Sequence, residues 1–173
     1  MSGRIGMERA IVLHRQAISE VVRVVEGQDP GAWLVAVRPG KWSPAEIAQH
    51  LVLSYEVPLE ELGGGTGFAV VLPWWKRAGL RWTVLRRILD GRFPRGAPAP
   101  REARPTSTAP SPAEAARTLG ESAALFERRL AEAHAERAVR LTHSYFGKLT
   151  APQILMLLGV HAAHHRSQFP PGP

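Results

Sequence analysis

The first part of the chain places apolar and polar residues with a helical period. Its apolar side chains recur at spacings of about one or two helical turns, at Ile11, Val12, Ile18, Val21, Val22 and Val25. Charged residues lie between them. The pattern predicts an amphipathic helix over about residues 5–26, which Gly27 and Pro30 are expected to end.

Three further helix starts share one capping pattern. In it, Ser or Thr is followed closely by Pro and, at the third position, by an acidic or amide residue. The pattern occurs as Ser43-Pro44-Ala45-Glu46, as Ser111-Pro112-Ala113-Glu114 and, in a weaker form, as Thr150-Ala151-Pro152-Gln153. The second helix is expected to kink or stop at Pro58, because proline lacks the backbone N–H. The helix from residue 111 is expected to reach about residue 135.

The middle of the chain is less regular. Residues 63–67 read Gly-Gly-Gly-Thr-Gly and predict a flexible break. Residues 68–79 fit a loop or a strand, whereas the apolar positions between Leu80 and Ile88 predict a helix up to about Leu89.

Residues 91–112 are dense in Pro, Gly, Ser and Arg, which predicts a long extended connection. The chain then has four long predicted helices and no convincing run of alternating strands. These features predict an all-α fold, a four-helix bundle that forms a single domain over residues 1–173.

The chain contains no cysteine. This excludes disulfides, thiolate metal ligands, iron–sulfur ligation and a cysteine nucleophile, so that histidine and carboxylate remain as metal ligands. The residues before Gly27 carry charges throughout and lack the uninterrupted apolar run of a signal peptide or a membrane span. We therefore expect a cytoplasmic protein with no membrane partner.

The formal net charge of +7 comes from one region. Residues 76–104 include nine Lys or Arg and two acidic residues, whereas the rest of the chain has 13 of each sign. One interpretation is a nucleic-acid or anion-binding surface, in which arginines contact phosphates and bases stack on Trp74, Trp75 and Trp82. The simpler interpretation is a solvated basic surface, with Trp82, Leu85 and Leu89 in the core.

The last predicted helix contains three of the seven histidines within five positions. Its apolar stripe over residues 154–158 continues by steps of three or four to His161 and His165. Their Cβ atoms are expected to lie roughly 5 to 6 Å apart on the buried face, so that two ring nitrogens can converge on one ion. His164 lies about 100° around the helix and is the poorest candidate ligand.

His50 shares a helical face with Ile47, Leu51 and Ser54. A single inward histidine is most simply a core imidazole that is hydrogen-bonded to the protein. Inward histidines on two helices also fit a shared divalent cation, because burying three such rings otherwise requires several separate partners. Spacing alone leaves both interpretations open.

A site of three histidines gives three neutral nitrogen ligands and leaves coordination positions for water or substrate, as in catalytic metal sites. Imidazole admits zinc, nickel, manganese or ferrous iron. Gln168 and Ser54 each lie one turn from a candidate ligand and are candidates to orient the rings. The alternative for each is an ordinary surface or interhelical hydrogen bond.

Two stretches resemble motifs of the DinB/YfiT-like superfamily: WSPAEIAQHL at residues 42–51 and HAAHHRSQF at residues 161–169. The resemblance implies a four-helix bundle with a metal triad formed by one histidine of the second helix and an H-x-x-x-H pair of the last. Here the triad corresponds to His50, His161 and His165.

A third stretch, THSYFGKLTAPQ at residues 142–153, resembles the HP-x-FG-x-LT lead-in of one uncharacterised branch of the superfamily. Two positions depart from the motifs: Ser144 replaces the usual proline, and Ser167 replaces a frequent glycine. Neither change affects a proposed ligand. The connection over residues 91–112 matches no motif of the superfamily.

Characterised members include metal-dependent thiol S-transferases and a mycothiol-dependent isomerase. The resemblance thus implies a metal-dependent enzyme in which a low-molecular-weight thiol attacks an electrophilic small molecule, and a chain without cysteine must take this thiol from outside. A hydrolase that uses metal-bound water is the nearest variant. The remaining alternative is a helical bundle that keeps the histidines but catalyses no reaction, either a homodimer or a binding protein.

The other histidines, His14, His134 and His143, are expected to have surface or structural roles. His14 lies on a helix with no partner motif, and His134 lies among Ala, Glu and Arg near a helix end. Tyr55 and Tyr145 are expected to lie in the core, and a place on the wall of a substrate cleft is the alternative for each.

Overall fold

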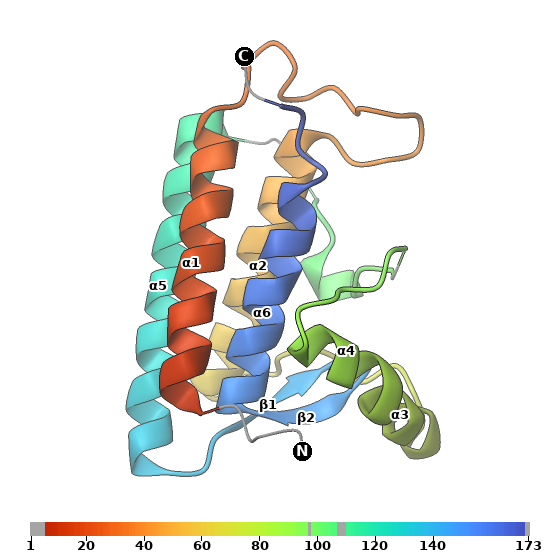
Figure 1. Ribbon diagram of the computed structural model, residues 1–173, viewed down its shortest axis with the longest axis vertical. Helices are drawn as coiled ribbons and strands as arrows, with labels where there is room; N and C mark the ends of the chain where they lie inside the picture. Colours follow the sequence, from red (N-terminus) through yellow and green to blue (C-terminus); the bar gives the residue numbers. More distant parts are fainter. Residues whose placement is uncertain (1–5, 97, 107–109, 172–173) are drawn as a thin grey trace.

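The computed structural model describes residues 6–96, 98–106 and 110–171. Four long helices run side by side (Figure 1): α1 (Met7–Glu26), α2 (Pro44–Leu62), α5 (Pro112–Glu136) and α6 (Ala151–Arg166). α1 packs against α5 and α6, and α2 packs against α5. The described chain is therefore mostly helical, as predicted.

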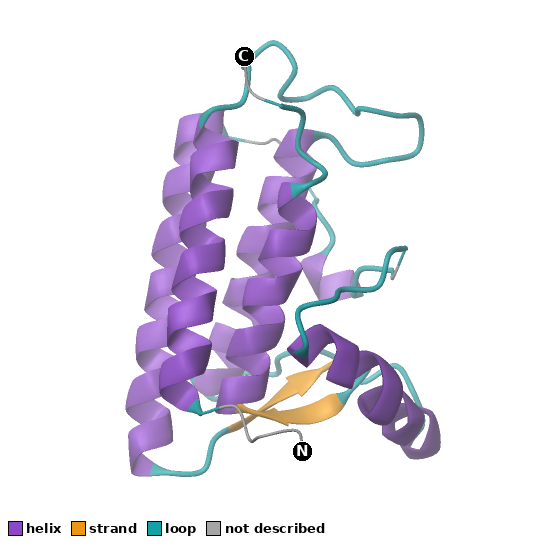
Figure 2. Cartoon of the chain, viewed as in Figure 1, coloured by secondary structure: helices purple, strands orange, loops and turns teal. Residues whose placement is uncertain are grey.

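A small antiparallel hairpin interrupts the helical pattern. It consists of β1 (Arg140–His143) and β2 (Gly147–Thr150), with Leu141 opposite Leu149, and lies at one end of the long helices (Figure 2). Gly147 has φ = 68°, a conformation that glycine adopts without strain, and it allows the tight turn. The prediction of a fold without strands was wrong here, because strands of four residues are too short to show an alternating pattern.

The predicted capping residues begin the helices as expected. Ser43 N donates to Glu46 Oε2 (2.7 Å), and Glu46 N donates to Ser43 Oγ (3.3 Å). The same reciprocal pair joins Ser111 and Glu114 at the start of α5. At α6, Thr150 N donates to Gln153 Oε1 (3.1 Å). These bonds satisfy N–H groups that a helix start leaves without partners.

Two local predictions need correction. The helix does not stop at Pro58: α2 continues through it to Leu62, and Pro58 itself is buried, so that packing offsets the hydrogen bond it removes. The helix predicted from Leu80 begins six residues earlier: α3 (Trp74–Leu80), the π-helical turn η1 (Arg81–Leu85) and α4 (Arg86–Leu89) follow one another without a break.

Trp82 lies in this π-helical turn and is 75% exposed, whereas Leu85 is buried. The wider i→i+5 turn changes the angular relation between these residues, which the α-helical spacing had placed together in the core. Trp74 and Trp75 are 73% and 57% exposed. The expectation that Trp82 belongs to the core was therefore wrong.

The Pro-rich connection over residues 91–112 has little regular structure in its described part, as predicted. Its regular element is the short 3-10 helix η2 (Arg101–Ala103), which packs against α2 and buries Ala103. Among the described residues, no helix combines the length and apolar character that crossing a membrane requires.

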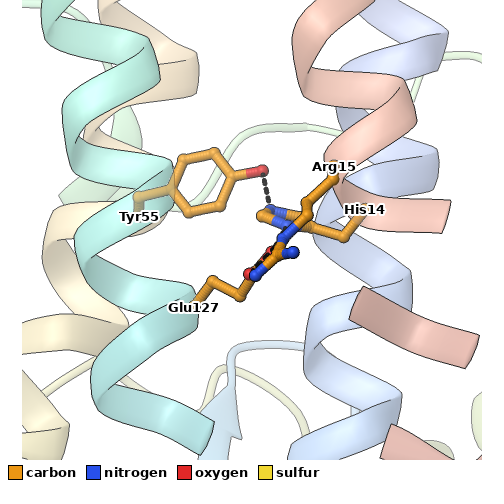
Figure 3. A network of polar contacts seen from close by, with 4 residues as sticks. All are labelled: His14, Arg15, Tyr55 and Glu127. Carbon is orange, nitrogen blue, oxygen red and sulfur yellow. Dashed lines mark hydrogen bonds and ion pairs between the residues drawn. The ribbon is translucent and has the colours of Figure 1, made fainter. Parts of the chain in front are cut away.

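A buried polar network links α1, α2 and α5 (Figure 3). His14 Nδ1 lies 2.8 Å from Glu127 Oε2, and His14 Nε2 lies 3.0 Å from the hydroxyl of Tyr55. Nδ1 donates to the carboxylate, and Nε2 shares a hydrogen bond with the tyrosine hydroxyl. Arg15 Nε donates to Glu127 Oε1 (2.7 Å). Thus His14 lies in the core and not on the surface, and Tyr55 is a core residue as expected.

This network shifts the pKa values of its acids. Burial acts to raise the pKa of Glu127, but the hydrogen bonds and charges of His14 and Arg15 outweigh it and hold the pKa below its usual range. Burial, and next the charge of Glu127, raise the pKa of Tyr55. Glu127 is therefore ionised and Tyr55 protonated at neutral pH, so the network retains its donors and acceptors.

Candidate metal centre

The structure brings the three predicted histidines together between α2 and α6. His50 Nε2 lies 3.1 Å from His161 Nε2, and His165 Nε2 lies 3.0 Å from the same atom. One ligand atom from each residue lies within 4.8 Å of the other two. Each ring thus turns the same nitrogen toward one point.

Hydrogen bonds on the far side of two rings set their orientation. His50 Nδ1 donates to the carbonyl of Ala103 (2.6 Å), and His165 Nδ1 donates to Gln168 Oε1 (3.0 Å). A neutral imidazole that donates from Nδ1 has a lone pair on Nε2. His50 and His165 therefore both present lone pairs to the centre.

Hydrogen bonds among the three rings cannot satisfy all of their lone pairs. His161 has one proton when neutral, and even if it lies on Nε2 it can serve only one of the two neighbouring lone pairs. A cation at the centre would accept all three lone pairs at once, and three nitrogen ligands are a set that Zn²⁺ and related ions accept. The donor set and the tautomers that the structure favours fit a divalent metal.

The pKa values support the same protonation states. Burial lowers the pKa of His165 to about 3. Burial and the neighbouring histidines, His165 first, lower the pKa of His161 well below its usual range. Burial also lowers the pKa of His50, although the hydrogen bond to Ala103 partly opposes it. All three rings are neutral at pH 7, which is the state that binds cations.

Aromatic rings pack against two members of the triad. Trp42 lies with its ring centroid 4.9 Å from that of His50, and Phe93 lies 5.0 Å from His161. Phe93 also stacks on His164 (5.0 Å). These apolar neighbours desolvate the imidazoles and so strengthen electrostatic interactions at the centre.

The other residues predicted for this region take different positions. His164 lies outside the converging group, and its Nε2 accepts from the side-chain amide of Gln168 (3.0 Å). Burial, and next the charge of Arg95, lower the pKa of His164. Gln168 therefore bridges His164 and His165. The hydroxyl of Ser54 donates to the main-chain carbonyl of His50 (2.8 Å) and forms no hydrogen bond with its ring.

The main-chain carbonyl of Ala103 orients the His50 ring, a role that the sequence suggested for Ser54. This carbonyl comes from the Pro-rich connection, which matches no motif of the superfamily. Any residue type can offer a main-chain carbonyl, so nothing in the side-chain pattern marked this position.

The triad lies on the wall of a cleft with a volume of about 1130 Å³. The cleft is also lined by His143 of β1, which the sequence had assigned to a surface or structural role. His143 Nδ1 accepts from the backbone N–H of Tyr145 (3.2 Å), and burial lowers the pKa of His143 to about 4. Neutral His143 therefore carries its proton on Nε2 and can donate it to a ligand.

Comparison with known proteins gives one family match. The model of the DinB superfamily matches residues 13–169, which include all the residues of the triad. No curated protein and no solved structure matches significantly. Since the match covers most of the sequence, the chain belongs to the DinB superfamily.

Proposed function

We propose that the protein is a divalent-metal-dependent enzyme whose ligands are His50, His161 and His165. The observation that carries the proposal is the convergence of their Nε2 atoms: His50 and His165 both present lone pairs there, and the single proton of His161 can serve only one of them. A bound zinc, nickel, manganese or ferrous ion would supply a nucleophile near neutral pH by lowering the pKa of a coordinated thiol or water.

The chain's own residues hold and shield this centre. Ala103 and Gln168 fix the tautomers and rotations of His50 and His165. Trp42 and Phe93 exclude water from the faces of the imidazoles. His143 donates from Nε2 to a substrate atom in the cleft. No cysteine is present, so any sulfur nucleophile comes from an external thiol.

Thiol S-transfer is the reaction we propose first. The sulfur of a low-molecular-weight thiolate attacks an electrophilic carbon, a carbon–sulfur bond forms, and the leaving group departs with the bonding electrons. The thiol proton passes to solvent. Hydrolysis, in which water takes the place of the thiol, is the variant to be tested beside it.

The proposal includes expectations about the whole protein. We expect α1, α2, α5 and α6 to form the four-helix bundle of the superfamily, within a single domain over residues 1–173. We also expect the protein to act in the cytoplasm. A homodimer is a further expectation, which light scattering of the purified chain tests.

Metal analysis of the untagged protein tests the site. We expect about one equivalent of a transition metal in the wild type, and loss of it in His50→Ala, His161→Ala and His165→Ala. His164→Ala is the matched control on the same helix, and it should retain the ion. A wild type without stoichiometric metal, or a His50→Ala variant with unchanged metal content, would refute the site.

A paired activity assay then separates the two reactions. The loaded protein is incubated with a chloro-substituted electrophile and a bacillithiol- or mycothiol-like thiol, and separately with an ester substrate without thiol. Chloride release that depends on both thiol and metal supports transfer. Ester cleavage alone supports the hydrolase.

A second candidate function involves the tryptophan surface, defined as Trp74, Trp75 and Trp82. The observation that favours it is the exposure of all three indoles, with Lys76 Nζ lying 5.1 Å from the centroid of the Trp75 ring. Exposed indoles beside Lys and Arg can stack on the bases of single-stranded nucleic acid. Filter binding with an oligonucleotide should then show affinity that falls steeply with salt. No retention at low salt would reject this function.

A further inference from the structure

The charged side chains on the wall of the cleft are all cationic. Arg38 and Lys41 lie on the loop between α1 and α2, and Arg95 lies on the segment after α4. All three are exposed, which places them at the mouth of the cleft. Among the described residues that line the cleft, none is Asp or Glu, although the chain has 15 acidic residues.

Among the residues that the structure describes, these three cations take part in no ion pair with an acidic side chain. The loop between α1 and α2 and the segment after α4 project from the same side of the long helices (Figure 1). The mouth of the cleft therefore has a positive potential that attracts anions.

Behind the mouth, the wall of the cleft is mostly apolar. Aliphatic side chains come from the helical segment over residues 74–89 and from α6: Leu80, Val84, Ile88, Ile154, Leu157 and Leu158. A volume of about 1130 Å³ is large enough for a ligand of drug size, with apolar walls and a few polar anchors. A small polar metabolite would leave much of this surface uncovered.

We infer that the cleft selects an anion with an extended apolar body, whose carboxylate, sulfonate or phosphate group lies among Arg38, Lys41 and Arg95. The apolar body lies along the helical walls of the same cleft, whose lining also includes the triad. The inference rests on the proposed function in that it treats this cleft as the substrate cleft.

A pair of fluorescent probes tests the inference on the full chain after removal of metal by a chelator. Anilinonaphthalene sulfonate and N-phenylnaphthylamine share one aromatic body, and only the first carries a negative charge. We expect the sulfonate to bind about tenfold more tightly, because three partly solvated charges that each contribute about twofold combine to roughly this factor. The variant Arg38→Gln/Lys41→Gln/Arg95→Gln should lose this preference while its affinity for the neutral probe stays within about twofold.

Two further variants locate the binding. Arg23→Gln removes an exposed arginine of α1 that does not line the cleft, and it should leave the preference unchanged. Val84→Trp places an indole in the apolar part of the cleft and should weaken the binding of both probes. Equal binding of the two probes by the wild type, or an unchanged preference in the triple variant, would overturn the inference.

The result is independent of the metal proposal because the probes are measured without metal. If the protein binds no metal and the preference is present, only the proposed function fails. If the protein binds metal and the preference is absent, only the inference fails.

Discussion

The Nδ1 atom of His50 donates to the main-chain carbonyl of Ala103 over 2.6 Å. This bond connects the irregular segment after α4 to a candidate ligand on α2. Because Ala103 is 1% exposed, its carbonyl cannot move without disturbing the packing around it. The position of the connection thus determines which nitrogen of His50 faces the triad.

Ala103→Leu should therefore weaken metal binding. The larger side chain overpacks a buried position and displaces the carbonyl, and loss of such an outer contact costs about 10- to 100-fold in metal affinity. Competition with a chromogenic chelator measures the effect, and circular dichroism checks that the fold is retained. Ala135→Leu, at an exposed position near the end of α5, is the control. Equal affinities in the two variants would show that the carbonyl does not orient the ligand.

Gln168 provides a second test of ligand orientation. Gln168→Ala removes the acceptor of His165 Nδ1 and should lower metal affinity by about tenfold. Gln168→Glu keeps an acceptor and should retain the affinity, because a carboxylate also holds a metal-binding imidazole in the Nδ1–H tautomer. The neighbouring Ser167→Ala is the control, since Ser167 Oγ donates only to the carbonyl of His164. A Gln168→Glu variant as weak as Gln168→Ala would argue against this role.

The buried network around Glu127 should make a large contribution to folding stability. Glu127→Ala leaves His14 without an acceptor in the core, and removing one partner of a buried pair costs about 3 kcal/mol of unfolding free energy. Glu132→Ala, on the same helix, breaks only exposed ion pairs and should cost less than about 1 kcal/mol. Urea denaturation measures both. Similar losses for the two variants would contradict a stabilising role of the network.

The metal-free protein should lose stability as the pH falls below about 6.5. Burial lowers the pKa of His143 to about 4, so between about pH 6.5 and pH 4 this side chain binds a proton in the unfolded chain but not in the folded one. Stability is therefore present above the unfolded pKa and declines on acidification, by about 1.4 kcal/mol per pH unit for each such histidine.

Replacing this histidine should reduce the pH dependence. In His143→Gln the slope of unfolding free energy against pH should be smaller than in the wild type by about 1.4 kcal/mol per unit over this window. Urea denaturation between pH 4.5 and about 6.5 gives both slopes. Parallel curves for the two proteins would mean that His143 is accessible to protons in the folded state.

Local sequence signals predicted those parts of the structure that local chemistry determines. Ser43 and Ser111 begin helices because their caps depend only on neighbouring residues. His161 and His165 share a face because helical periodicity alone places them there. The helical face of His50 marked it as a possible third ligand, and the DinB resemblance, whose family the match confirms, favoured the shared site over a core imidazole.

The remaining features depend on tertiary contacts. A π-helical turn moved Trp82 to the surface, and the spacing of apolar residues does not reveal such a turn. The carbonyl of Ala103 reaches His50 from 53 positions away, and a main-chain group has no sequence signature. The hairpin that places His143 in the cleft is also formed by strands too short to be recognised.

The Nε2 atoms of His50 and His161 meet although 111 positions separate them along the chain. In a protein without cysteine, an ion held there would be a reversible cross-link between α2 and the C-terminal helix. Its contribution to thermal resistance would grow with the logarithm of the free ion concentration. Melting temperatures recorded against a panel of transition metals would then rank their affinities before any substrate is known.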